Sequence, residues 1–504
     1  MTMGNDMLKP QFDTSFAEKK EHAARFTRTA ILMLLKAVNE VAGGKCRVCV
    51  EFKYVDGYYV VVHGAAQDEA FAAAVKKKMQ EYVAQDLPVV PVAVRTKDAI
   101  LAAQKDGDIK QEHLLNYFAA GKVFYYELDG FRAFFVDTLL HSTGEVNYFD
   151  LIAFRGGLLL KLPDEDGNPV PDTKFRSEKL FTMQREGEEF AYKTGMDSLS
   201  DLNDAICAEE AGQTVLMQEA YFEKQLVDVA NEVIRRGSRF VLMAGPSSSG
   251  KTTTTYRLAI QLKTFGYEPQ VISADDYFKP KENFAFLPDG TVDYESINAL
   301  DTALFNDDML KLLAGEEVEV PSFNFVKQAR EYHGKKISLG EKKIIIIEGI
   351  HCLNPAFSEK LPEESKMKVY LSAVTPLNIN DHSPISTSDC RLLRRIVRDN
   401  RTRGTSASET LAMWPGVRMG EKEYIFPYQD LADMMINTTL VYELAALKLF
   451  AGPLLFAIRR DDPQYKEARR LLKFLEHILP MSPESIPRTS IIREFIGGSL
   501  IDIS

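Results

Sequence analysis

The feature that most constrains this chain is a glycine-bounded loop between an apolar segment and a helix. Residues 240–244, FVLMA, have the length and composition of a buried strand, and the loop GPSSSGKTT follows at residues 245–253. Apolar residues then recur at helical spacing from Tyr256 to Leu262. In such a loop the backbone amides and the positive end of the helix dipole bind phosphate oxygens. The pattern GxxxxGK[ST] therefore predicts a nucleoside triphosphate site.

Each position of this phosphate-binding loop has an expected role. Lys251 would reach the β- and γ-phosphates, and the Thr252 hydroxyl would ligate Mg²⁺. The cofactors predicted are therefore ATP or GTP, together with Mg²⁺. The other residues expected to bind the nucleotide are Gly245, Ser247, Ser248, Ser249, Gly250 and Thr253.

Length, charge and composition limit the class of protein to which the chain can belong. The length of 504 residues is enough for about three domains, and the net charge of −11 gives no general attraction to nucleic acid or anionic membranes. No apolar stretch approaches the roughly 18 residues of a membrane span, and the start lacks a signal-peptide core. Five cysteines fit a reducing compartment better than a disulfide framework. These features predict a cytoplasmic protein without a membrane partner, and they disfavour nucleic acid as a partner. The partner expected is a small-molecule acceptor, and homo-oligomerisation stays open.

The first 200 residues are expected to form an α+β domain. Apolar residues at helical spacing from Phe26 to Val41 predict an amphipathic helix, and a second helix is expected from about Gln67 to Gln85. Segments rich in β-branched and aromatic residues predict strands at 47–54, 58–63, 122–128, 132–137 and 158–162, with a further extended segment at 88–94.

Two segments of this domain carry a resemblance. HSTGEVNYFDL at 141–151 and VEFKYVDGYYVVV at 50–62 resemble the second additional domain of threonyl-tRNA synthetases, which edits mischarged tRNA. The histidine pair of that editing site falls on Arg28 and Leu32. The resemblance therefore implies the fold and not the editing chemistry. Ligand binding, orientation of the second half and assembly all stay open as roles.

Paired carboxylates follow the next apolar segment of the second half. QVISADDYFK, residues 270–279, places Asp275 and Asp276 at the carboxyl end of a short strand, where open α/β sheets bind ligands. A hydroxyl that accepts a phosphoryl group needs a carboxylate to orient it and take its proton. The alternative is that these aspartates only cap a helix.

GPSSSGKTT and ISADDYFK together resemble the uridine kinase and phosphoribulokinase family, with its GxSGSGKT and ISxDxFYK motifs. The resemblance implies that Asp275 is the catalytic base. TVDYESINALD at 291–301 resembles the segment that contacts the nucleoside ribose, although a solvated loop is an equal alternative, and PSFNFVKQAR at 321–330 resembles the PxYDFVTHSR segment that contacts the base. The acceptor-binding residues implied in this way are Asp276, Phe278, Asp293, Glu295, Phe323, Gln328 and Arg330.

Four consecutive isoleucines, Ile344 to Ile347, predict a central parallel strand buried on both faces. The strand ends at Glu348-Gly349, where a carboxylate can hold Mg²⁺ directly or through water, and the family resemblance includes EGI at this point.

Residues 387–404 have the densest charge pattern. We expect Ser388 to cap a helix with an inward apolar face made by Leu392, Leu393, Ile396 and Val397, and with projecting arginines at 391, 394, 395, 398, 401 and 403. RLLRRIVRDNRTRG resembles the RLSRRxxRDxxxRG lid of the family, which implies that Arg395, Arg398 and Arg403 clamp phosphate and act in catalysis with Lys251. A basic patch for RNA is the alternative.

Beyond this helix, loops are expected at 414–418 and 423–429, a closing strand at 432–437, helices within 441–479 and an unassigned tail at 488–499. The fold class predicted is α/β, a P-loop kinase with a parallel sheet and a helical lid, preceded by the α+β domain. The boundaries predicted are 1–200, 201–238 for a helical connection, 239–440 for the kinase and 441–504 for a helical extension. The function predicted is phosphorylation of a nucleoside 5′-hydroxyl. The alternatives are a kinase for another small alcohol or sugar phosphate, and a nucleotide-gated RNA-binding regulator.

Overall fold

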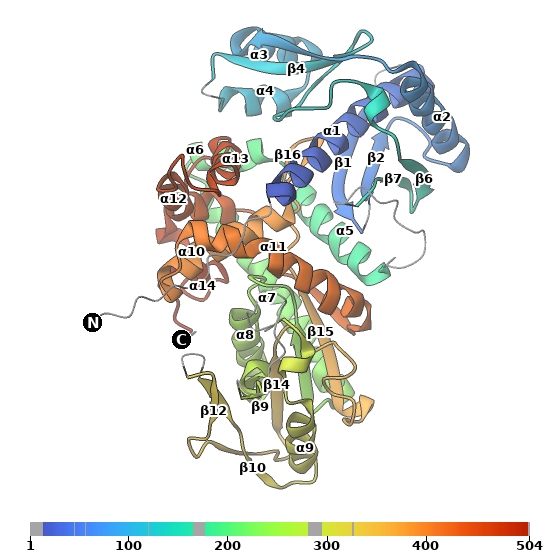
Figure 1. The fold of residues 1–504 in the computed structure, drawn as a ribbon. Helices are drawn as coiled ribbons and strands as arrows, with labels where there is room; N and C mark the ends of the chain where they lie inside the picture. Colours follow the sequence, from blue (N-terminus) through green and yellow to red (C-terminus); the bar gives the residue numbers. More distant parts are fainter. Residues whose placement is uncertain are drawn as a thin grey trace.

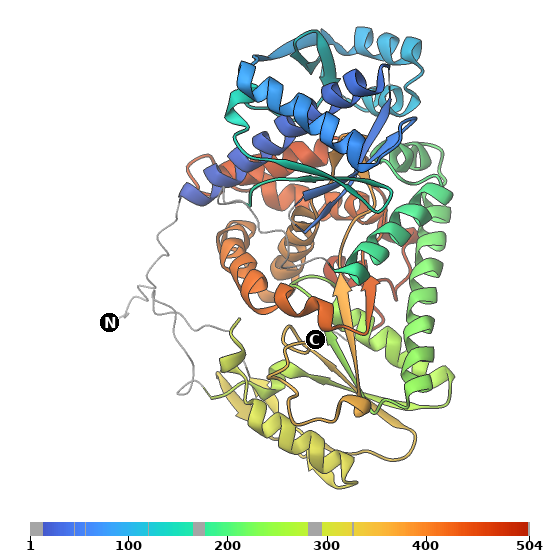
Figure 2. The same ribbon diagram turned by 90° about the vertical axis from the view of Figure 1, so that its right-hand side faces the viewer.

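The computed structural model describes residues 14–44, 46–55, 57–118, 120–164, 177–280, 295–324 and 327–501. Residues 14–161 lie at one end of the molecule, and the parallel sheet of the predicted kinase region (residues 239–440, called the kinase half below) lies at the other, with the helices of residues 387–496 between them (Figure 1). A view turned by 90° shows the same order (Figure 2). Within these ranges no helix combines the length and the apolar character that crossing a membrane requires.

The N-terminal part contains two antiparallel sheets and four helices. The first sheet has the strand order β1-β2-β7-β6 and the second has the order β3-β4-β5. The helices are α1 (Thr14–Ala42), α2 (Glu69–Gln85), α3 (Thr96–Asp106) and α4 (Ile109–Asn116). The strands are β1 (Arg47–Tyr54), β2 (Gly57–His63), β3 (Val89–Arg95), β4 (Lys122–Leu128), β5 (Phe131–Phe134), β6 (Asp150–Phe154) and β7 (Gly157–Lys161). The strands predicted at 47–54 and 58–63 are confirmed as β1 and β2, which pair as an antiparallel hairpin. Helix α1 begins twelve residues before Phe26, since its first turns carry few apolar residues.

Three helices connect this part to the kinase sheet, namely α5 (Glu178–Lys193), α6 (Leu199–Cys207) and α7 (Ala211–Arg236). The apolar face of α7 is buried in the same core as the sheet, with Phe222, Leu226 and Val229 at most 1% exposed. Gly237 ends the helix in the left-handed conformation, at φ 66°. Helix α7 is therefore part of the core of the kinase half.

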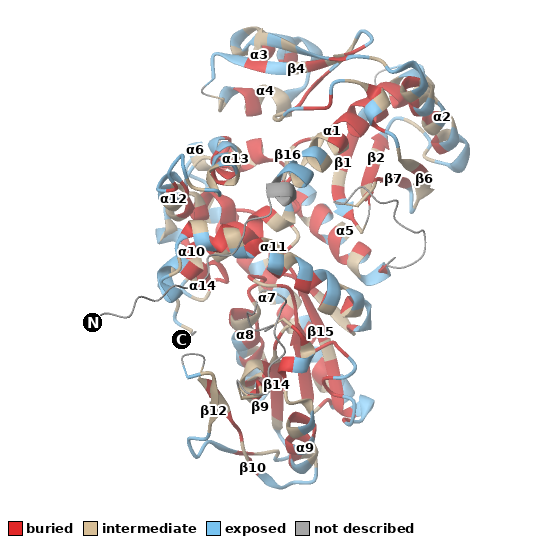
Figure 3. Cartoon of the chain, viewed as in Figure 1, coloured by how far each residue is buried: buried red, intermediate tan, exposed pale blue. Residues whose placement is uncertain are grey.

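A five-stranded parallel sheet forms the centre of the kinase half. Its order is β18-β15-β8-β14-β9, so the isoleucine strand β14 lies between β8 and β9, as predicted for a central strand. Ile344 to Ile347 are at most 2% exposed, and the buried colour runs along β14 and β15 in Figure 3. The strands are β8 (Phe240–Ala244), β9 (Glu268–Ser273), β14 (Lys343–Glu348), β15 (Lys366–Ser372) and β18 (Met434–Asn437), and α8 (Lys251–Thr264) follows β8.

Several short elements belong to the same half of the chain. They are the 3-10 turns η2 (Ala274–Tyr277) and η4 (Ile297–Ala299), helix α9 (Thr302–Leu313), the hairpin of β11 (Ser322–Asn324) with β12 (Ala329–Glu331), the pair of β10 (Glu317–Glu319) with β13 (Lys336–Ser338), and the hairpin of β16 (Asn378–Asn380) with β17 (Ser383–Pro384). The last hairpin leads directly into α10 (Thr387–Arg403), the arginine-rich helix.

The predicted loop at 414–418 is wrong, because α11 (Ala407–Tyr424) runs through it with Pro415 inside the helix. A capping box of Ser406 and Glu409 starts this helix, and Trp414 is only 3% exposed. Burial of a large aromatic residue thus outweighs the hydrogen bond that proline removes.

The predicted tail at 488–499 is also wrong. After α12 (Glu443–Phe456) and α13 (Tyr465–Glu476), residues 492–496 form a short helix, α14 (Ile492–Ile496). Ile491, Ile492 and Phe495 are fully buried in the core of the kinase half. The chain end thus packs against the elements that carry the predicted site.

Candidate nucleotide and acceptor site

Three strand ends meet at one edge of the sheet. Glu348 at the end of β14 pairs in register with Met243 of β8 and with Ser273 of β9. The phosphate-binding loop follows β8, and Asp275 lies two residues after β9. The loops that carry the predicted donor, metal and acceptor residues therefore leave the sheet side by side, as expected at the carboxyl edge of an open α/β sheet.

The phosphate-binding loop turns through two residues with positive φ, Ser248 at 59° and Gly250 at 80°. Helix α8 begins at Lys251 with Gly250 as its N-cap, so no side chain of the capping residue satisfies the first amides. Lys251 Nζ donates to the Gly245 and Pro246 carbonyls at 3.1 and 3.3 Å. The loop thus presents helix N-terminal amides and a lysine, the groups that bind phosphate.

Thr252 and Glu348 fit a divalent cation. The Thr252 hydroxyl donates to Glu348 Oε1 at 3.3 Å. Burial raises the pKa of Glu348 to about 7, Lys251 opposes that shift, and the negative charges of Asp275 and Glu494 add to it. Because a cation would relieve this repulsion and because hard oxygen ligands suit Mg²⁺, these two residues are chemically suited to the metal predicted from the sequence.

The two aspartates after β9 differ in their surroundings. Burial raises the pKa of Asp275, and the nearby Lys251 is the main opposing influence. Asp276 instead accepts a hydrogen bond from the Phe323 backbone amide at 3.3 Å. Asp275 therefore interacts with the charge of Lys251 in the phosphate-binding loop, whereas Asp276 connects the β11–β12 hairpin to the end of β9 through a hydrogen bond.

Several of the residues implied as acceptor-binding contact one another in the segments that follow Asp275. Phe278 and Phe323 are 5% and 7% exposed, and their ring centroids lie 5.4 Å apart. Arg330 donates to the Phe278 carbonyl at 3.0 Å and to Asp301 Oδ2 at 3.1 Å. Gln328 has a positive φ of 51° in the turn of the hairpin. Asp293 lies outside the described residues.

Glu295 lies at the site itself. Burial raises its pKa to about 7, Arg395 is the main opposing charge, and Lys251 and Asp275 also act on it. Gly420 of α11 approaches so closely that an added Cβ would lie 2.8 Å from Glu295 Cβ. Glu295 is thus held between α11 and the groups expected to carry out phosphoryl transfer.

The sequence analysis missed His351, three residues after Glu348. This side chain is 2% exposed, and burial lowers its pKa to about 4, so the imidazole is neutral at physiological pH. Its ring lies 6.1 Å from that of Tyr424 in an edge-on arrangement.

Two of the arginines expected to project from α10 are buried. Arg391 forms an ion pair with Glu421 and donates to the Ser247 carbonyl at 3.1 Å. Arg394 is completely buried, pairs with Glu443 and donates to the Thr438 carbonyl at 2.8 Å. The expectation of six projecting arginines is therefore wrong, because carboxylates from α11 and α12 neutralise the inner face of the helix. The four apolar residues predicted to face inward are buried as expected.

The three arginines implied as phosphate clamps share one carboxylate. Asp399 is 1% exposed and forms ion pairs with Arg395 at 3.1 Å, with Arg398 at 2.8 Å and with Arg403 at 3.5 Å. Arg395 Nη1 also donates to Ser247 Oγ at 2.7 Å, so it contacts the phosphate-binding loop.

The N-cap of α10 differs from the prediction. Ser386 is the capping residue, and its side chain accepts from the Asp389 amide. Ser388 instead accepts from Trp414 Nε1 at 3.3 Å, because the helix begins one residue before it, at Thr387.

Two glutamates that the sequence analysis did not identify bind amides of the phosphate-binding loop. Glu421 Oε1 accepts from the Ser247 amide at 3.1 Å, and Glu494 Oε2 accepts from the Thr253 amide at 3.2 Å. They lie 174 and 241 residues further along the chain, so no local pattern could have linked them to the loop.

Comparison with known proteins finds a family match that covers the residues of this candidate site. The phosphoribulokinase / uridine kinase family matches residues 240–444, which is less than half of the chain. Uridine kinase of Macrococcus caseolyticus is 29% identical over 195 residues, covering 38% of this chain and 85% of that protein. Uridine kinase of Staphylococcus aureus is 27% identical over 202 residues, covering 40% of this chain and 88% of that protein.

A solved kinase structure from Silicibacter sp. TM1040, described provisionally as a fructose transport system kinase, is 17% identical. It covers 42% of this chain and 98% of that chain with a TM-score of 0.30, which is too low to carry an argument. The family match and the curated relatives support a phosphotransferase built on residues 240–444. The family match begins after the N-terminal part, so the synthetase-like resemblance there stays a prediction.

Proposed function

We propose that this protein transfers the γ-phosphoryl group of ATP to the 5′-hydroxyl of a nucleoside. The observation that carries the proposal is the register of β8, β14 and β9, which brings Lys251, Glu348 and Asp275 to one edge of the sheet. The similarity of residues 240–444 to uridine kinases supports this reaction class.

Asp275 is proposed to orient the acceptor hydroxyl and to take its proton as the bond to phosphorus forms. The raised pKa of Asp275 makes this carboxylate a better proton acceptor, and the positive charge of Lys251 opposes the shift by favouring the ionised form. Glu295, beside Arg395, is proposed to bind acceptor hydroxyls from the α11 side.

The donor is proposed to bind along the phosphate-binding loop. Lys251 would leave the Gly245 and Pro246 carbonyls to pair with the phosphates, and Arg395 would add positive charge from the Ser247 side. Thr252 and Glu348 would hold Mg²⁺, which supplies charge neutralisation for the phosphoryl oxygens when bound. Arg398 and Arg403 are proposed as further phosphate contacts, released from Asp399 when the donor binds.

An aspartate-to-asparagine pair tests the proposed base. In Asp275→Asn, turnover should fall by about 10² or more while ATP affinity stays within about threefold, because the asparagine cannot accept the proton. The matched variant Asp276→Asn should keep turnover within about tenfold, since Asp276 binds the Phe323 amide. Full turnover in Asp275→Asn, measured as ADP released in the presence of a nucleoside, would move the base elsewhere.

Two residues of the β11–β12 hairpin support a second class of acceptor, a phosphorylated sugar or another small alcohol. Phe323 and Gln328 occupy the positions of the tyrosine and the histidine in the family segment PxYDFVTHSR, which residues 321–330 resemble, and Phe323 packs against Phe278. A base-recognising hydrogen bond from position 323 is therefore absent, which leaves a phosphorylated sugar or another small alcohol as the rival acceptor. Acceptor-dependent ADP release across a panel of nucleosides and sugar phosphates separates the two classes.

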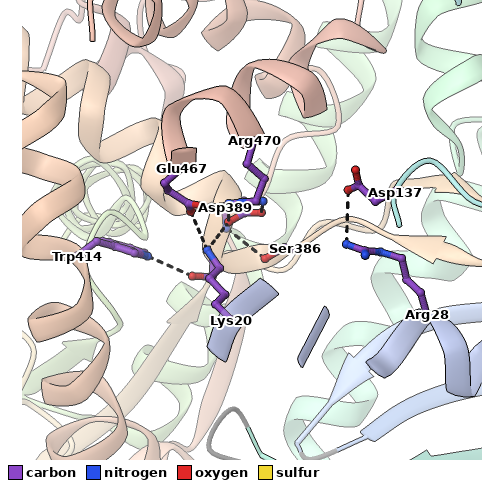
Figure 4. A network of polar contacts seen from close by, with 9 residues as sticks. Lys20, Arg28, Asp137, Ser386, Asp389, Trp414, Glu467 and Arg470 are labelled. Carbon is purple, nitrogen blue, oxygen red and sulfur yellow. Dashed lines mark hydrogen bonds and ion pairs between the residues drawn. The ribbon is translucent and has the colours of Figure 1, made fainter. Parts of the chain in front are cut away.

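The N-terminal part, proposed to share the fold of the synthetase domain, is proposed to orient α10. The Val50 amide of β1 donates to the Asp381 carbonyl at 2.7 Å, in the hairpin that leads into α10. Lys20 of α1 pairs with Asp389 at 3.3 Å and with Glu467 at 2.9 Å, and Arg470 binds Asp389 through both terminal nitrogens (Figure 4). The start of the arginine helix is thus tied to the N-terminal part at two points.

A further inference from the structure

A carboxylate from the end of the chain contacts the phosphate-binding loop. Glu494 of α14 accepts from the Thr253 amide at 3.2 Å and from the Thr253 hydroxyl at 2.8 Å, both through Oε2. Thr253 is the third residue of α8, so its amide is one of the helix N-terminal donors without an intrahelical partner. Glu494 lies outside residues 240–444 and is 7% exposed.

The same donors are the ones that a nucleotide needs. In a loop of the GxxxxGK[ST] type, the backbone amides around the helix start hold phosphate oxygens, and the helix dipole favours a negative charge there. One amide hydrogen cannot serve a carboxylate and a phosphate at full strength. The Glu494 carboxylate therefore occupies part of the site that the sequence predicts for the donor.

The Glu494 carboxylate adds negative charge to this edge of the sheet. The carboxylate is held by the two neutral donors of Thr253, and its negative charge is among the influences that raise the pKa of Glu348. A triphosphate would bring further negative charge to the same edge of the sheet. Nucleotide binding should therefore favour a state in which Glu494 has moved away.

Residues 491–495, around Glu494, pack closely against the phosphate-binding loop and α10. Ile491 lies over Gly250, where an added Cβ would come within 2.5 Å of Ile491 Cγ2. Arg401 of α10 donates to the Glu494 and Phe495 carbonyls at 2.8 and 3.0 Å. The Phe495 ring centroid lies 5.2 Å from the Arg394 guanidinium. The arginine helix thus holds α14 against the phosphate-binding loop.

We propose that Glu494 is an internal competitor of the nucleotide, which occupies the Thr253 amide of the phosphate-binding loop and is displaced when ATP binds. The C-terminal segment then sets the nucleotide affinity, and Arg401 is a positioning residue for it. The inference rests on the proposed nucleotide binding and names a regulator of that same site.

Binding of ATP with Mg²⁺ and without any acceptor tests the proposal by isothermal titration calorimetry on the full chain. The variant Glu494→Gln keeps the size and the hydrogen-bond acceptor but removes the charge, so ATP should bind about tenfold more tightly. The control Glu484→Gln changes an exposed glutamate of the same segment and should leave affinity within twofold. Arg401→Met, which releases the segment without changing Glu494, should also tighten binding, and it decides the matter if Glu494→Gln does not fold.

A gain below threefold, or a loss of affinity, in the folded variant overturns the proposal, because a carboxylate that only caps α8 would weaken the site when neutralised. Tripolyphosphate, which lacks the nucleoside, should show the same gain as ATP. A gain confined to ATP would place the obstruction at the base and overturn the assignment to the phosphate amides. Normal ATP binding without transfer to any acceptor would contradict the proposed function and leave this inference standing, whereas no ATP binding by any of the proteins would overturn both.

Discussion

The buried ion pair of Arg394 and Glu443 should make the inner face of α10 important for the stability of the folded protein. Arg394 is 0% exposed and Glu443 is 1% exposed, and Arg394 also donates to the Ser248 and Thr438 carbonyls. Arg394→Met leaves the Glu443 carboxylate without its cation and leaves two carbonyls without a donor. Removing one partner of a buried pair destabilises by about 3–5 kcal/mol.

That loss corresponds to a fall of roughly 6–20 °C in Tm at about 2–4 °C per kcal/mol for a kinase half of this size. Differential scanning calorimetry of the full chain measures it. The matched control Arg403→Met removes a half-exposed arginine from the same helix and should cost at most about 1 kcal/mol.

A double variant separates the pair from its surroundings. Arg394→Met with Glu443→Gln should be more stable than the sum of the two single losses by about 1 kcal/mol or more, because it leaves no buried charge unpaired. If Arg394→Met is no more destabilising than Arg403→Met, the inner face of α10 is not part of the core, and the reasoning about this helix is wrong.

Three other predictions concern the site and the end of the chain. Burial raises the pKa of Glu348 to about 7, so the folded protein binds a proton at Glu348 more tightly than the unfolded chain does. This proton contributes fully to the free energy of unfolding below about pH 4.5, and the contribution is lost as the pH rises through 7. The thermal stabilisation by Mg²⁺ should therefore grow through pH 7 and be absent in Glu348→Gln. Gly250→Ala, at φ 80° and against Ile491, should lower Tm and weaken ATP binding in fluorescence titrations. Phe495→Ala should cost about 3–5 kcal/mol in urea unfolding, against less than about 1 kcal/mol for the exposed Phe265→Ala.

The centre of the kinase half could be predicted because its signals are local. Four isoleucines in succession require burial on both faces, and a glycine-bounded loop before a helix has one well-defined use. The convergence of Lys251, Asp275 and Glu348 then follows from the rule that parallel strands end at one edge, and the register of β8, β14 and β9 agrees with it.

The contacts that the sequence did not predict join residues far apart in the chain. Arg391 and Arg394 were expected on the surface because their partners, Glu421 and Glu443, follow 30 and 49 residues later. Helical periodicity shows which face is apolar, but not whether a second helix with buried carboxylates covers the other face. A helix as short as α14 has no periodicity to detect, so its burial and the Glu494 contact could not be foreseen.

The central claim is that an acceptor hydroxyl beside Asp275 receives the γ-phosphoryl group of ATP. Phosphorus NMR of the full chain with ATP, Mg²⁺ and a mixture of nucleosides observes the product directly. The account predicts a nucleoside 5′-monophosphate resonance that grows in step with ADP and is lost in Asp275→Asn. Inorganic phosphate appearing at the same rate with and without acceptor, and no phosphomonoester of any nucleoside or sugar, would contradict it.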